Sequence, residues 1–186
     1  MPGRDERVGG VGGHIGAPHN ARLPPMNELT PLASSLATLL KERNQTIAIA
    51  ESSAGGLISA ALLAVPGASA YFIGGAVVYT QAARRALLRV PDESLAGIRS
   101  STEAYAVLKA RTVRELLGAT WGLAETGASG PTGNRYGDAP GHACIAVAGP
   151  VERVITVETR SPDREANMWK FTQAALELLQ TSLQRA

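Results

Sequence analysis

The chain has 186 residues, which fits one domain of ordinary size with room for a substantial core. A net charge of +2 is too small to argue for a nucleic-acid partner, and a hydrophobic content of 45% with only 4% aromatic residues predicts a core of Ala, Leu, Val and Ile. The single cysteine, Cys144, excludes an internal disulfide and a cysteine-based metal cluster. We expect neither a metal nor a cofactor.

The start of the chain has no apolar segment of the kind that a signal peptide contains. Residues 52–83 carry no charge, but Pro66-Gly67 and Gly74-Gly75 divide them into pieces too short to cross a membrane. We therefore expect a soluble, cytoplasmic protein that does not bind membranes. A homo-oligomer is compatible with the sequence.

Residues 1–25 differ in composition from the rest of the chain. They are rich in Gly, Pro and Arg, contain few large apolar residues and show no periodicity. This composition predicts a disordered tail followed by one folded domain, residues 26–186. The alternative is that translation starts at Met26. His14 and His19 lie in this tail and make a poor metal site.

From residue 26 onward, signals for helices and strands alternate. Helices are expected at 29–43 (with Thr30 and Pro31 as cap and first-turn residue), 55–65, 81–88, 91–95, 102–117 and 161–183, and strands at 47–50, 72–80, 121–125, 143–148 and 151–159. The last two strands are joined at Gly149-Pro150 as a hairpin. This order predicts a layered α/β sandwich with a mixed sheet.

The most informative stretch is residues 46–60, where a short apolar strand runs into a glycine-rich turn and then a helix. Glu51, Ser52 and Ser53 lie where the strand ends, and Gly55-Gly56 follow. Such a turn presents backbone amides and the positive end of a helix dipole, beside hydroxyls that can attack a carbonyl or bind an anion. The spacing matches neither a phosphate loop nor a nucleophile elbow. The structural alternative is that a serine caps the helix and the glycines permit close packing.

A second turn, residues 126–133, has the same design of an apolar strand followed by hydroxyls and glycines. Ligands of open α/β sheets bind outside the carboxyl ends of strands, so we expect the two turns to line one cleft. Tyr79 and Arg84 lie at the exit of the second strand, and His142 precedes the fourth; we expect all three nearby. The alternative is that these are ordinary structural residues at strand ends.

Several motifs resemble those of the CinA C-terminal domain, the nicotinamide mononucleotide (NMN) amidohydrolase family. The segments are Ala50-Glu-Ser-Ser-Ala-Gly-Gly56, Val65-Pro-Gly-Ala-Ser69, Gly75-Ala-Val-Val-Tyr-Thr-Gln-Ala-Ala-Arg84, Thr126-Gly-Ala-Ser-Gly-Pro131 and Asp163-Arg164. They follow the family order over roughly residues 28 to 184. The resemblance implies a three-layer α/β/α sandwich with a mixed sheet.

The resemblance also implies a site for hydrolysis of the NMN carboxamide to the acid and ammonia. Ser52 occupies the position of the proposed nucleophile, Tyr79 belongs to a matched motif, and the Gly55-Gly56 amides are expected to form the oxyanion site. The expected ligand-binding positions are Glu51, Ser53, Gly55, Gly56, Thr126, Gly127, Gly130 and Arg164.

The sequence departs from the family pattern at the position of its lysine, which is Arg84 here. Arginine cannot lose its proton at any relevant pH, and no other lysine is expected near a matched motif. His142, where the family has a threonine, is the candidate substitute base. Three alternatives stay open: an amidohydrolase in which Arg84 holds phosphate or a substrate oxygen, a non-catalytic domain that binds a phosphorylated nucleotide, and a structural or partner-binding domain.

Overall fold

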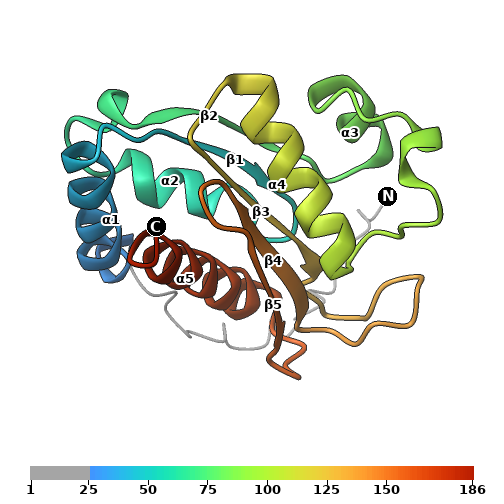
Figure 1. Cartoon of the computed structure of the whole chain (residues 1–186). Helices are drawn as coiled ribbons and strands as arrows, with labels where there is room; N and C mark the ends of the chain where they lie inside the picture. Colours follow the sequence, from blue (N-terminus) through green and yellow to red (C-terminus); the bar gives the residue numbers. More distant parts are fainter. Residues whose placement is uncertain (1–25) are drawn as a thin grey trace, which may run out of the picture.

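The structure is a computed structural model that describes residues 26–186; the predicted tail, residues 1–25, lies outside the described residues. Five strands form one sheet in the order β2-β1-β3-β4-β5 (Figure 1). The strands are β1 (Ile47–Glu51), β2 (Phe72–Val77), β3 (Trp121–Ala128), β4 (His142–Ala148) and β5 (Arg153–Glu158). β2, β1 and β3 are parallel, whereas β4 is antiparallel to both of its neighbours, so the sheet is mixed as expected.

Helices cover both faces of this sheet, which makes the predicted three-layer α/β/α sandwich (Figure 1). The α-helices are α1 (Thr30–Glu42), α2 (Leu57–Leu63), α3 (Gln81–Leu87), α4 (Glu103–Leu117) and α5 (Arg164–Leu183), and short 3-10 turns lie at Met26–Glu28, Ala68–Ala70 and Asp92–Leu95. α1, α2 and α5 enclose one apolar core with the sheet, and α4 encloses the other. Within residues 26–186, no helix combines the length and the apolar character that crossing a membrane requires.

The central strands are apolar because both of their faces are covered. All residues of β1 and of β4 are buried, and β1 ends in the buried carboxylate of Glu51. β1 and β3 are adjacent and parallel, so their carboxyl ends meet at one edge of the sheet. β2 lies at the edge, and its pairing with β1 is irregular beside Gly74, as the glycines in this strand predicted.

Three details of the predicted elements are wrong. β2 ends at Val77, three residues before the expected end at residue 80. β3 extends three residues beyond the expected end at Glu125, because residues 126–128 pair with the start of β4. The N-cap of α1 is Leu29 rather than Thr30, and no side chain caps this helix end.

The expected ends of α4 and α5 are confirmed. The Thr102 hydroxyl accepts a hydrogen bond from the Tyr105 amide at 3.3 Å, and Asp163 accepts one from the Ala166 amide at 3.0 Å. Gly118 ends α4 with φ +62°, a left-handed conformation that favours glycine.

Candidate ligand-binding and active site

A cavity of about 620 Å³ lies beside the carboxyl ends of β1, β2 and β3. Its lining comes from the strand ends, the start of α3, the segment that leads into α4, and the loop before β4. The lining residues are Ser52, Val78, Tyr79, Thr80, Gln81, Ala82, Arg85, Ser100, Ser101, Tyr105, Thr126, Gly127, Asn134, Arg135 and Tyr136.

Four residues that the sequence singled out lie together in this cavity: Ser52, Tyr79, Thr126 and Gly127. The parallel strands bring them together, because each follows or ends a strand at the same edge of the sheet. The roles assigned to them stay predictions.

Glu51 holds the turn after β1 from within rather than facing the cavity. Its buried carboxylate accepts hydrogen bonds from the amides of Gly56, Ile58 and Ser59 at 2.8–3.0 Å and from the Ser59 hydroxyl at 2.6 Å. A carboxylate at this place stabilises the amino end of α2. The chain therefore supplies its own anion where we expected one from a ligand.

The Gly55-Gly56 amides do not form the expected oxyanion site. Gly55 donates to the Ser52 carbonyl at 3.1 Å, and Gly56 donates to Glu51. Both glycines have positive φ angles, +70° and +101°, so they shape the turn instead. Neither of them lines the cavity.

A second buried carboxylate, that of Glu125 on β3, holds the serines of this turn. It accepts hydrogen bonds from the amides of Ser52 at 3.0 Å and Ala54 at 2.8 Å, and from the Ser53 hydroxyl. Burial raises the pKa of Glu125, although the charge of Lys109 and these hydrogen bonds oppose the rise. Ser53 is thus a buried structural residue, and Ser52 is the serine that faces the cavity.

Lys109 was not among the residues predicted for the site. We expected no lysine near the matched motifs once the family's lysine is replaced by Arg84, and this expectation is wrong. Lys109 is buried, and its amine donates a hydrogen bond to the Glu125 carbonyl at 2.9 Å. Burial lowers its pKa to about 8, against the opposing charges of Glu125 and Glu51. The signal was present in the helical spacing, since Lys109 lies between the apolar residues Ala106 and Ala110 on the buried face of α4.

Arg84 does not line the cavity, which corrects its expected role in holding the ligand. It is 1% exposed, donates from Nε to the Val90 carbonyl at 3.1 Å, and pairs with Asp92. On α3, Arg84 shares its face with the core residue Leu88, four positions later. Its neighbour Arg85 lies on the face that lines the cavity.

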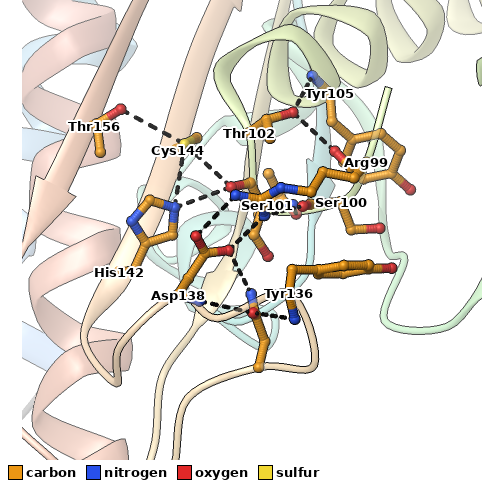
Figure 2. Close-up of polar contacts among 12 residues, drawn as sticks. Arg99, Ser100, Ser101, Thr102, Tyr105, Tyr136, Asp138, His142, Cys144 and Thr156 are labelled. Atoms are coloured by element: carbon orange, nitrogen blue, oxygen red, sulfur yellow. Dashed lines mark hydrogen bonds and ion pairs between the residues drawn. The ribbon is translucent and has the colours of Figure 1, made fainter. Parts of the chain in front are cut away.

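His142 lies behind the cavity wall, and both of its ring nitrogens have partners. Nδ1 lies 2.5 Å from a Glu158 carboxylate oxygen. Nε2 lies 3.0 Å from the Ser101 carbonyl, a contact that Figure 2 shows. Burial alone would lower the pKa of His142, but the hydrogen bonds to Glu158 and Ser101 outweigh it and raise the pKa. His142 is therefore in no position to take a proton from Ser52, which corrects its expected role as base.

Gly130 and Arg164 support the rim instead of lining the cavity. The Arg164 guanidinium donates to the Gly130 carbonyl at 2.7 Å and to the Tyr79 hydroxyl at 3.1 Å. Gly130 has φ +115°, and a side chain there would meet the Pro162 carbonyl. Arg164 thus acts on the cavity through Tyr79.

The remaining wall comes from a loop that the sequence analysis left unassigned. Asp138 accepts two hydrogen bonds from Arg99, at 2.6 and 2.9 Å, and this pairing lowers the pKa of Asp138. The Arg99 guanidinium lies 5.4 Å from the Tyr136 ring centre. Figure 2 shows the rings of Tyr105 and Tyr136 on one side of the 99–101 segment and His142 on the other.

The lining has a consistent chemical character. Two arginines, three tyrosines and further hydroxyl residues line the cavity, and none of its described lining residues is acidic. Guanidinium groups bind phosphate and carboxylate, and aromatic rings pack against planar ligands. No cluster of three or more metal-binding side chains occurs in residues 26–186. The cavity therefore suits an anionic ligand that carries an aromatic ring.

The fold is that of an α/β domain with a mixed sheet and a cavity at the carboxyl ends of its parallel strands. The family model of the CinA C-terminal domain matches residues 29–183. The chain belongs to the CinA C-terminal domain family.

The relatives agree with this assignment. CinA-like proteins from Gloeobacter violaceus and Synechococcus sp. are 39% and 38% identical over 82% and 74% of this chain. The chain spans about a third of the length of these relatives, 36% and 33% respectively.

Solved structures extend the likeness to the fold. A CinA superfamily protein from Klebsiella pneumoniae has a TM-score of 0.79 at 26% identity, covering 85% of this chain and 99% of that one. A competence/damage-inducible protein from Agrobacterium tumefaciens has a TM-score of 0.76 at 27% identity, covering 87% and 98%.

Proposed function

We propose that the cavity binds a phosphorylated pyridine nucleotide such as NMN. The observation that carries this proposal is the charge of the lining: Arg85 and Arg135 are present, and none of the described residues that line the cavity is acidic. A phosphate gains charge-assisted hydrogen bonds from guanidinium groups. The exposed ring of Tyr136 offers a surface for the pyridine, and the many hydroxyls suit a ribose.

In this proposal the phosphate binds Arg85, and not Arg84 as the sequence predicted. The Arg85 guanidinium is about half exposed; it lies 3.4 Å from Asp92 and donates a long hydrogen bond of 3.5 Å to the Gln81 carbonyl, so an incoming phosphate competes only with weak, exposed contacts. Arg84 is buried and already has two partners. Displacing it would leave a buried charge without compensation.

A second candidate function is hydrolysis of the carboxamide of the bound nucleotide, giving the acid and ammonia. The specific observation in its favour is the position of Ser52, whose side chain lines the cavity beside Thr126 while its backbone amide is fixed by Glu125. A nucleophile needs such fixed placement and a base within reach. Tyr79 is one of the three tyrosines that line the cavity, and the Arg164 guanidinium donates a hydrogen bond to its hydroxyl at 3.1 Å.

Calorimetric titration with NMN and with nicotinamide riboside, which lacks the phosphate, tests the proposed ligand class. We expect NMN to bind at least about tenfold more tightly, because the phosphate gains charge-assisted hydrogen bonds. Replacing Arg85 or Arg135 by Ala is expected to weaken NMN and to leave the riboside unchanged. Equal affinities for the two ligands would contradict the proposed ligand class.

Ammonia release from NMN tests the second candidate on the same protein. If Ser52 is the nucleophile, wild type releases ammonia and Ser52→Ala loses at least about 10³-fold in rate. Ser53→Ala is the matched control for the loss of a hydroxyl from the same turn. NMN binding without ammonia release would leave the domain as a binder.

A further inference from the structure

Lys109 is a buried cation whose amine contacts the carbonyls of two residues, and each of these residues immediately precedes a cavity-lining residue in the sequence. It extends from α4 and is 1% exposed. Its amine nitrogen lies 2.9 Å from the Glu125 carbonyl and 3.5 Å from the Glu51 carbonyl. Ser52 follows Glu51, Thr126 follows Glu125, and both line the cavity. One amine thus joins the carboxyl end of β1 to the carboxyl half of β3 beneath the cavity.

The same amine is surrounded by opposite charge. Glu51 from β1 and Glu125 from β3 are fully buried, and both act on Lys109 electrostatically. On its own helix, the Tyr105 ring centre lies 5.8 Å from the amine nitrogen. Two buried carboxylates without a cation would repel any anion placed above them, because charges interact strongly where water is excluded.

We propose that Lys109 is a positioning residue of the cavity: its protonated amine holds the ends of β1 and β3 together and supplies the positive charge that lets an anionic ligand bind above Glu51 and Glu125. The second part of this proposal rests on the proposed function, whereas the first part does not.

The protonation of Lys109 provides the test. Because burial lowers its pKa to about 8, Lys109 loses its proton between about pH 7 and 9. The loss turns its charge-assisted hydrogen bonds into weaker neutral ones. It also leaves the two carboxylates uncompensated, so the cavity floor becomes more negative.

Nuclear magnetic resonance can follow this titration in the protein without ligand. The chain has only three lysines, so the Lys109 side-chain carbon next to the amine is readily assigned after lysine labelling. We expect the amide signals of Ser52 and Thr126 to shift with pH and to share the midpoint of Lys109 itself, since the carbonyls preceding them are its partners. If Lys109 titrates while these amides stay still, the positioning role is wrong.

The double variant Lys109→Met/Glu125→Gln is the matched control. It removes one positive and one negative charge together, and such paired replacement is tolerated far better than removal of one partner. In this variant we expect the Ser52 and Thr126 amide shifts near pH 8 to disappear. If the variant shows the same shifts, the proposal is wrong. If the variant does not fold, the comparison of the Lys109 titration with the Ser52 and Thr126 amide shifts in wild type still decides the question.

Ligand titration tests the electrostatic part. NMN affinity is expected to fall about fivefold or more from pH 7 to pH 9, at the lower end of typical coupling between linked sites. Nicotinamide riboside, which carries a positive ring and no phosphate, should show no such loss. An NMN affinity that does not depend on pH would overturn the electrostatic role of Lys109. If NMN does not bind even at pH 7, the proposed function is wrong, and the nuclear magnetic resonance experiment alone decides the positioning role.

Discussion

At the scale of single residues, the site depends on which of two adjacent arginines faces the ligand. Arg84 and Arg85 follow each other in the sequence, yet one is 1% exposed and the other lines the cavity. Successive residues of a helix point about 100° apart, so a matched motif position does not by itself fix which side chain reaches a ligand. The buried Leu88, four residues after Arg84, is the sequence feature that could have assigned Arg84 to the core side.

These two arginines give opposite predictions on substitution. Arg84→Ala removes a buried hydrogen bond to the Val90 carbonyl and a partly buried one to Asp92, and should lower the free energy of unfolding by about 1–3 kcal/mol. Arg85→Ala should change it by no more than about 0.5 kcal/mol, because the side chain is half exposed. Urea denaturation measures both, and a larger loss for Arg85 would contradict the placement of the two side chains.

The sequence patterns correctly placed the turn after β1 beside the cavity. The prediction that the glycine amides of this turn bind the ligand was wrong. Ser52 and the two glycines were recognised because a strand, a glycine turn and a helix follow in order. The use of the amides could not be predicted, because their partners, Glu51 and Glu125, are brought to the turn by the folded sheet. Glu125 is 73 residues away from Ser52 in the chain.

At the scale of elements, helix ends were predicted better than strand ends. Thr102, Gly118 and Asp163 are local signals, and local hydrogen bonds confirm the two side-chain caps. The end of β3 depends on pairing with β4, which no local signal reports. As a result, Thr126 and Gly127 were taken for loop residues although they belong to a strand.

The contact between β4 and the segment before α4 predicts a pH dependence of stability. The folded-state pKa of His142 is raised by its hydrogen bonds, so its contribution to stability is fully present below pH 6.5 and is lost as the pH rises through the folded-state pKa. His142→Gln should therefore cost more unfolding free energy at pH 6 than at pH 8.5, as urea denaturation at the two pH values would show. An equal cost at both values would mean that the imidazolium form has no advantage in the fold.

At the scale of the whole molecule, the order of the strands places the cavity. The chain passes from β1 through α2 to β2, and then through α4 to β3 on the other side of β1. α2 and α4 belong to opposite apolar cores, so the connections leave the sheet on opposite faces (Figure 1). A crevice forms where connections diverge in this way, outside the carboxyl ends of β1 and β3.

The fold class followed from the alternation of helices and strands together with the family motifs, because those signals are spread over the whole domain. The residues of the cavity wall could not be predicted in this way, since Tyr105, Arg135 and Tyr136 come from segments without a motif and are brought together only by the fold. Lys109 was missed for a related reason, because a lysine on the buried face of a helix is unusual and its partners are carbonyls of other strands.

The most direct test of the proposed ligand site is a crystal structure of Ser52→Ala with NMN bound, at a pH of about 7. We expect the phosphate within hydrogen-bond distance of Arg85 or Arg135 and the carboxamide directed toward position 52, beside Thr126. NMN bound elsewhere on the domain, or bound here with its phosphate away from both arginines, would contradict it.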